Sequence, residues 1–176
     1  MPACRIRSHG ANLNLHLPHN WLDELLLECQ RRFTTELVPI RGAASTVKTI
    51  VERGDQVCVA SSTDLFGLRE NLKRTGLLSL LAPHVFSVDQ VKRPKPAPDV
   101  FLFAASQMGV DPADTIVIED SIAGVLAGRR AGMRVFGFTG GGHAYSNLAS
   151  RVMDAGAEHV CSAMDEVVGR LSSLKF

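Results

Sequence analysis

The first regular pattern in the chain is an apolar stripe near the N-terminus. Between residues 21 and 37, apolar side chains recur three or four positions apart, namely Trp21, Leu22, Leu25, Leu26, Cys29, Phe33 and Leu37. This spacing predicts an amphipathic helix, with Asn20 at its N-cap. Residues 1–20 have no such period and contain several turn-forming residues, so we expect a loop there.

A second pattern begins after "VPIRGA" (38–43), where a proline and a glycine break the helical period. Short runs rich in valine and isoleucine follow, at residues 56–61, 84–88, 115–119, 134–138 and 158–162. They alternate with stretches of helical period, at residues 48–53, 64–75, 98–109, 121–131, 145–154 and 163–173. This alternation predicts a Rossmann-like α/β fold, a parallel sheet with helices on both faces. We expect an N-terminal loop and helix over residues 1–40 and an α/β core over residues 41–176.

Composition narrows the choice of partner. The chain has 19 lysines and arginines against 18 acidic residues, so no basic surface indicates nucleic acid or anionic lipid. No apolar run is long enough for a membrane span, and the N-terminus lacks the apolar core of a secretory signal. Four cysteines are scattered without CxxC spacing, which favours reduced, buried thiols over disulfides or zinc ligands. We therefore expect a soluble, cytoplasmic protein, a monomer or weak homo-oligomer, that binds a small molecule.

Ligands of parallel α/β proteins bind beyond the carboxyl ends of the strands, so polar residues there are the first candidates. The first clear strand ends in "ASSTD", which presents Ser61, Ser62 and Thr63 just before a predicted helix. Hydroxyl groups beside the N–H groups of a helix N-terminus form a site for a phosphate. The alternative is that Thr63 or Asp64 only caps the helix.

A basic, proline-rich segment precedes the helix at 98–109. In "VKRPKPAPDVF", Lys95 stands between two prolines that we expect to hold the backbone extended and stiff. A lysine presented in this way is suited to a fixed negative charge. The alternative is a solvated basic loop.

Two carboxylates follow a third strand. Glu119 ends the run "TIVIE", and Asp120 follows it directly before another predicted helix. Magnesium is usually held by one or two carboxylates together with phosphate oxygens and water, so this pair supplies enough protein ligands for a magnesium ion. The alternative is that Asp120 or Ser121 caps the helix. Hydroxyl groups, a lysine and an acid pair together predict a magnesium-assisted phosphoryl-transfer site.

These segments resemble the haloacid dehalogenase-like hydrolases, in particular the β-phosphoglucomutase-like enzymes and small sugar-phosphate phosphatases. "VASSTD" resembles the second motif of that family, "KPAPDVF" the third and "VIEDSIAGVLAGRRAGM" the fourth. The resemblance implies a HAD-like core and an aspartyl-phosphate mechanism. It also implies that Ser61 and Ser62 bind the phosphoryl group, that Lys95 stabilises its charge, and that Asp120 with Glu119 holds Mg2+. The helix at 21–37 resembles the end of a helical cap.

One part of the family pattern is absent from the sequence. The first motif, DxDG, supplies the nucleophilic aspartate at the end of a central strand, but upstream of Ser61 only Asp23 and Asp55 occur and neither has a second aspartate two positions on. We therefore expect an N-terminally shortened chain that is close to inactive alone. Without that strand, which the family places between the strands ending at Ser61 and Glu119, the sheet has to close a gap, borrow a strand or stay marginally stable.

One alternative stays open beside the shortened phosphatase. The chain would then be a non-catalytic relative that binds a phosphorylated metabolite or has a regulatory role. A receiver-like signalling domain is disfavoured, because its acid pair belongs on the first strand. The sequence does not distinguish phosphatase from mutase, and it does not select a substrate because most of the cap is missing.

Overall fold

The computed structural model describes residues 5–8, 11–14, 18–142 and 146–174. The chain divides into two units, Met1–Leu37 and Val38–Phe176.

The N-terminal unit begins with a β-hairpin. β1 (Arg5–Ser8) pairs antiparallel with β2 (Ala11–Asn14), and Ile6 lies opposite Leu13. The expectation of a loop is therefore wrong for these residues. The strands were not recognised because each has a single large apolar residue among polar ones, which is too little for a period of two to be read.

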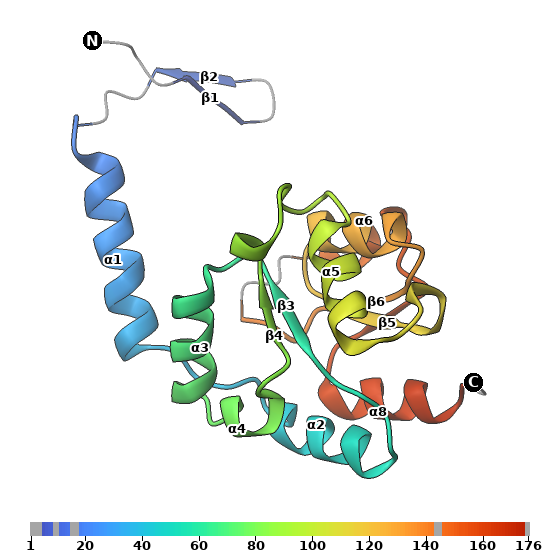
Figure 1. The fold of residues 1–176 in the computed structure, drawn as a ribbon. Coiled ribbons are helices and arrows are strands. Elements are labelled where there is room, and N and C mark those ends of the chain that lie inside the picture. Colours follow the sequence, from blue (N-terminus) through green and yellow to red (C-terminus); the bar gives the residue numbers. More distant parts are fainter. Residues whose placement is uncertain (1–4, 9–10, 15–17, 143–145, 175–176) are drawn as a thin grey trace. The chain divides into compact units, whose positions relative to one another are not determined.

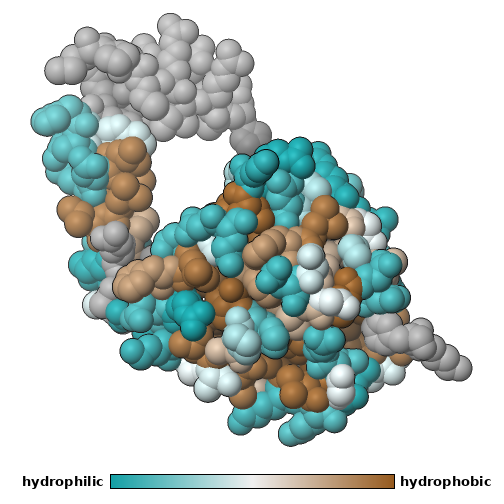
Figure 2. Space-filling view, in the orientation of Figure 1, coloured by the Kyte–Doolittle hydropathy of each residue, from teal (hydrophilic) through white to brown (hydrophobic). Residues whose placement is uncertain are grey.

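The N-terminal unit ends with α1 (Trp21–Thr35), which confirms the predicted amphipathic helix. Asn20 is at the N-cap, but its side chain donates to the Glu24 carboxylate rather than capping the backbone. Leu22, Leu25 and Leu26 are 50%, 49% and 53% exposed, and apolar colour runs along α1 in Figure 2. These three leucines of the predicted apolar face are not buried within the N-terminal unit.

In the described residues of the second unit, five parallel strands form two sheets. β3 (Val59–Ser61) pairs with β4 (Val85–Ser87). β5 (Ile116–Glu119), β6 (Arg134–Phe138) and β7 (His159–Cys161) form the other sheet, in that order. All five predicted strands are present.

Within the described residues, no ladder hydrogen bond joins β3 to β5, so each strand keeps a free edge. The N–H of Val59 donates to the His84 carbonyl at 3.1 Å. Because successive peptide groups of a parallel strand alternate in direction, those of Ala60 point away from β4. By the same alternation, the peptide groups of Ile118 point away from β6. The two sheets have thus not merged into one.

Helices cover both faces of the strands, which confirms the predicted α/β fold. Figure 1 shows α5 (Asp99–Met108) and α6 (Ile122–Arg130) on one side, and α2 (Ala43–Glu52) and α8 (Met164–Ser172) on the other. The remaining elements are α3 (Leu65–Arg74), α4 (Leu78–Leu81), α7 (Leu148–Asp154) and the 3-10 turns η1 (Val88–Gln90) and η2 (Pro112–Asp114). None of the helices in the described segments is long and apolar enough to cross a bilayer.

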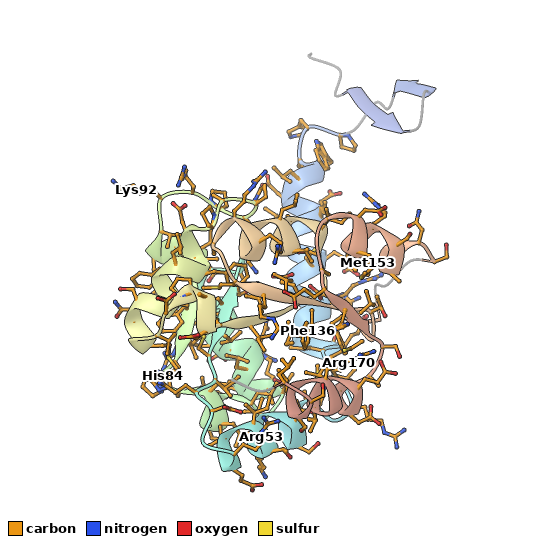
Figure 3. The ribbon with its side chains drawn as sticks, turned by 90° about the vertical axis from the view of Figure 1, so that its right-hand side faces the viewer. Arg53, His84, Lys92, Phe136, Met153 and Arg170 are labelled. Carbon is orange, nitrogen blue, oxygen red and sulfur yellow. The ribbon has the colours of Figure 1, made fainter. Side chains whose placement is uncertain are left out.

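Successive side chains of β6 pack into separate apolar clusters. Val135 packs in a cluster with residues of α5, α6 and α7, whereas the next residue, Phe136, packs in a cluster with residues of α8. Both side chains are fully buried, and Figure 3 shows Phe136 in the interior near α8. A third cluster joins α3, α4 and β4.

Two helix starts differ from the prediction by more than two residues, and one short helix was not predicted. α2 begins at Ala43 rather than at residue 48, directly after Gly42, whose φ of 84° suits glycine. Its first residues are small, so they show no apolar period. α4 was not predicted, because four residues are too few for one. α7 begins at Leu148, and residue 145, where we predicted its start, lies outside the described residues.

The cysteine prediction is confirmed only in part. The cysteines in the described residues, Cys29, Cys58 and Cys161, are all free. Cys161 is buried, and burial raises the pKa of its thiol. Cys29 and Cys58 are exposed, so the expectation of burial is wrong for them; Cys4 lies outside the described residues.

Candidate functional site

Lys95 links the ends of the two sheets. Its ammonium group donates to the carbonyl of Ala60 in β3 at 3.3 Å and forms an ion pair with Glu119 at the end of β5. It also lies 4.5 Å from the centre of the Phe101 ring, a cation–π contact. The lysine side chain is 9% exposed. The alternative of a solvated basic loop is therefore wrong for Lys95.

The backbone that carries Lys95 is a turn. The N–H of Ala97 donates to the Pro94 carbonyl at 3.0 Å. The expectation of an extended segment is therefore wrong. Proline has no N–H for a ladder and is well suited to turns, so closely spaced prolines also allow this conformation.

Two contacts brace this turn from outside. Arg93 forms a hydrogen-bonded ion pair with Asp99 at 2.8 Å, which holds the pKa of that carboxyl below its usual range. Arg130 in α6 donates to the carbonyl of Pro96 at 2.8 Å. Lys92, in contrast, is exposed and points outward in Figure 3. Of the lysines in this segment, only Lys95 faces the strand ends.

Glu119 is buried and has several donors. Its carboxylate is 9% exposed and accepts from Lys95, from the N–H of Ser121 at 3.2 Å and from the Ser121 hydroxyl at 3.0 Å. It lies directly against Gly124.

The capping alternatives are confirmed for Ser121 and Asp64. The Ser121 hydroxyl accepts from the N–H of Gly124 at 3.0 Å and caps α6. The Asp64 carboxylate accepts from the N–H of Gly67 at 2.8 Å and caps α3. The helix caps are thus made by Ser121 and Asp64, and the functional interpretation of Ser61, Glu119 and Asp120 stays a prediction.

A second carboxylate binds the start of α3. Asp89 accepts from the N–H of Leu65 at 2.9 Å. With Asp64, two acidic groups therefore already bind N–H groups that we expected to favour an anion. A phosphate at this strand end would have to rely on hydroxyl groups and on Lys95.

A buried serine at the end of β4 holds the backbone that follows Ser61 and Ser62. Ser61 accepts from the N–H of Thr63 at 3.1 Å and is partly buried, whereas Ser62 is exposed. Ser87, fully buried at the end of β4, donates to the carbonyl of Thr63 at 2.7 Å. Sequence reasoning missed Ser87 because the predicted strand ran to Val88, one residue past the true end of β4.

Asp120 is partly buried beside Glu119. No group of three or more acidic, histidine or cysteine side chains that could hold a metal is found among the residues that the structure describes. One or two carboxylates nevertheless suffice for magnesium when water and phosphate supply the other oxygens. Asp120 and Glu119 meet that requirement in number, and both oxygens of Glu119 already accept hydrogen bonds, from Lys95 and from Ser121.

An open cavity of about 750 Å³ lies elsewhere, between the N-terminal ends of α2 and α8. It is lined by residues such as Ser45, Thr49, Phe138 and Met164. None of the predicted site residues lines it, so it is separate from the Lys95–Glu119 pair.

Comparison with known proteins gives the family. The family model of the haloacid dehalogenase-like hydrolases matches residues 8–132. That match contains the segments around Ser61, Lys95 and Asp120.

Individual relatives agree with this assignment. The 6-phosphogluconate phosphatase of Escherichia coli is 31% identical over 66% of this chain and 51% of its own length. A HAD family hydrolase of Deinococcus radiodurans, solved with bound phosphate and sodium, has a TM-score of 0.80 at 31% identity, covering 88% of this chain and 68% of that one. A putative β-phosphoglucomutase of Thermotoga maritima has a TM-score of 0.76 at 25% identity, covering 89% and 70%.

The chain spans about half, or less, of the length of the curated relatives that it matches. The family match, over residues 8–132, contains β3, β4, β5 and the loops that carry the predicted site. The chain therefore belongs to the haloacid dehalogenase-like hydrolases, in the subgroup that resembles β-phosphoglucomutase and the sugar-phosphate phosphatases.

Proposed function

We propose that this chain carries the phosphoryl-binding part of a magnesium-dependent, cytoplasmic phosphatase site for a small sugar-phosphate-type metabolite. The contact of Lys95 with both Ala60 and Glu119 carries the proposal, because it brings a cation to the ends of β3 and β5 together. Relatives named as phosphatases of 6-phosphogluconate and of hexitol phosphates support the substrate class.

Each predicted residue has one role in this proposal. Ser61 and Ser62 hydrogen-bond the phosphoryl oxygens through their hydroxyl groups, and Lys95 offsets the negative charge of the group being transferred. Asp120, with Glu119 beside it, would hold the magnesium ion, which supplies further positive charge at the phosphoryl oxygens when bound.

The nucleophile has to come from outside these residues. The chain contains no DxDG motif, and hydrolases that lose their nucleophile lose most of their rate, by factors of about 10⁴ to 10⁶. The free edges of β3 and β5 support the idea that a strand ending in this motif pairs with both. We propose that the 176-residue chain corresponds to a shortened enzyme and is inactive alone.

The test is an assay of the purified chain on an aryl phosphate with magnesium. We expect no more turnover than with the Asp120→Asn variant. Turnover that Asp120→Asn abolishes would contradict the claim that the nucleophile lies outside the chain.

A second candidate is a non-catalytic relative that binds a phosphorylated metabolite. The presence of Ser61 and Lys95 without DxDG favours it, because binding needs no nucleophile. Micromolar binding of a sugar phosphate to the folded chain would support this role, and a chain that is unfolded alone would exclude it.

A further inference from the structure

The carboxylate of Glu119 occupies the place where a side chain at position 124 would be. A Cβ atom built on Gly124 overlaps the carboxyl carbon and both carboxylate oxygens of Glu119. Gly124 is itself buried, in the first turn of α6. The absence of a side chain therefore creates the space that the carboxylate fills.

The same turn fixes the direction of the carboxylate. The Ser121 hydroxyl donates to Glu119 at 3.0 Å and accepts from the N–H of Gly124 at 3.0 Å. The N–H of Ser121 donates to the same carboxylate oxygen at 3.2 Å. One oxygen is thus held by Ser121, which directs the other toward Lys95.

We propose that Gly124 is a positioning residue, whose missing side chain lets Glu119 reach Lys95 and hold its ammonium group beside Ala60. Glu119 then acts mainly as the fixed counter-ion of Lys95. A role of this arrangement in catalysis rests on the proposed function. The positioning of Glu119 against Lys95 by Gly124 does not depend on it.

Another glycine in α6 provides a contrast. A Cβ on Gly128 would lie 2.7 Å from a methyl group of Val135 and 3.5 Å from Val117. Gly128 therefore allows α6 to approach the sheet closely. Gly124 instead makes room for a charged side chain.

The test measures how fast Lys95 is acetylated by acetic anhydride in the folded chain, followed by digestion and mass spectrometry. Lys92, exposed in the same loop, serves as the internal standard. Because Gly124→Ala displaces the Glu119 carboxylate, we expect the Lys95 rate relative to Lys92 to rise about tenfold or more.

Two glycine variants serve as controls. Gly128→Ala disturbs the packing of the same helix without touching Glu119, and Gly169→Ala adds a methyl group that meets nothing within 4 Å. We expect the relative rate at Lys95 to change less than about twofold in both. An equal rise in Gly124→Ala and Gly128→Ala would overturn the proposal, because loosening of α6 would then explain the effect.

Rescue separates positioning from general damage. Glu119→Asp withdraws the carboxylate by one methylene, so the alanine methyl group fits beside it. In the Glu119→Asp background, we expect Gly124→Ala to cause a smaller drop in melting temperature than in the native chain. We also expect a smaller rise in the acetylation rate of Lys95. Equal effects in both backgrounds, or an unchanged Lys95 rate in Gly124→Ala, would overturn the proposal.

The proposal also covers the case in which Gly124→Ala does not fold. The double variant Gly124→Ala with Glu119→Asp must then fold, and an unfolded double variant would overturn the proposal as well. Neither measurement involves phosphate, so a failure of the proposed function would leave the result at Lys95 unchanged.

Discussion

Lys95 and Glu119 form an ion pair in which each side chain is only 9% exposed. Removing two charges from water costs several kcal/mol unless both also have other polar partners. Lys95 has the Ala60 carbonyl and the Phe101 ring, and Glu119 has Ser121. The pair is therefore tolerated in the interior, and it is sensitive to the loss of one member.

We expect Lys95→Met to destabilise the fold by about 3–5 kcal/mol, because it leaves the Glu119 carboxylate buried without its counter-ion. Lys95→Met combined with Glu119→Gln removes both charges and should cost clearly less. Urea unfolding of the two variants measures the difference. Equal losses would mean that the charge on Glu119 is not what makes Lys95→Met costly.

A second prediction concerns the ion pair that braces the Lys95 turn. Arg93 lowers the pKa of Asp99 through a hydrogen bond and its charge. A carboxyl group with a lowered folded pKa stabilises the fold above its unfolded pKa of about 3.9, and this contribution is lost as pH falls through the folded value. Asp99→Asn should therefore lower the melting temperature at pH 7 and have no effect at the acid end.

Melting curves between about pH 2.5 and pH 7 measure this dependence. Arg93→Gln is the matched control and should abolish the same pH-dependent part. A melting temperature that Asp99→Asn lowers equally at all pH values would contradict the assignment of the lowered pKa to Arg93.

The individual residues of the site were predictable to different degrees. Ser61, Lys95 and the acid pair could be proposed from the sequence because each follows a strand or precedes a helix. Gly124 could not, because its role depends on the direction in which the Glu119 side chain leaves the strand. Ser121 and Lys95 set that direction, and no periodic pattern in the sequence indicates it.

At the scale of elements, β4 and the β3–α3 loop are joined by one buried side chain. Ser87 donates to the Thr63 carbonyl at 2.7 Å and accepts from the N–H of Asp89 at 3.3 Å. Gln90 completes a capping box by accepting from the N–H of Ser87. This network connects the ends of two neighbouring strands, so it fixes the loop that carries Ser61.

We expect Ser87→Ala to cost about 1–3 kcal/mol, because it leaves the carbonyl of Thr63 without its donor. Exposed Ser106 in α5 provides the control, and Ser106→Ala should be within about 0.5 kcal/mol of the native chain. Denaturant unfolding measures both. A loss no larger than that of Ser106→Ala would show that water replaces the hydroxyl.

Elements with a strong period were predictable, whereas short elements and the start of α2 were not. The valine- and isoleucine-rich runs located all five strands, and the leucine stripe located α1. The start of α2 and the whole of α4 were missed, because alanines, serines and four-residue turns have no apolar period. The β1–β2 hairpin was missed for the same reason.

At the scale of the whole chain, the strands of the second unit remain in two sheets. Without the central strand of the family, the sheet could close the gap, borrow a strand or stay marginally stable. Within the described residues β3 and β5 do not pair, so the gap has not closed. Stability then depends strongly on the apolar clusters on either side, and Phe136 is the largest fully buried side chain described.

We expect Phe136→Ala to destabilise the fold by about 3–5 kcal/mol, a large part of the 5–15 kcal/mol typical of a domain. Phe66 in α3, 78% exposed, is the matched control, and Phe66→Ala should change stability by less than about 0.5 kcal/mol. Thermal and urea unfolding test this. Similar losses in the two variants would mean that the β6–α8 core is not packed as described.

The central claim is that the ends of β3 and β5 form a phosphoryl-binding site through Lys95. Isothermal titration calorimetry with inorganic phosphate and magnesium tests it most directly, in the native chain, in Lys92→Met, and in Lys95→Met combined with Glu119→Gln. We predict equal affinity in the native chain and Lys92→Met, and a loss of about tenfold or more in the double variant. Equal binding in all three, or none to the folded native chain, would contradict the claim.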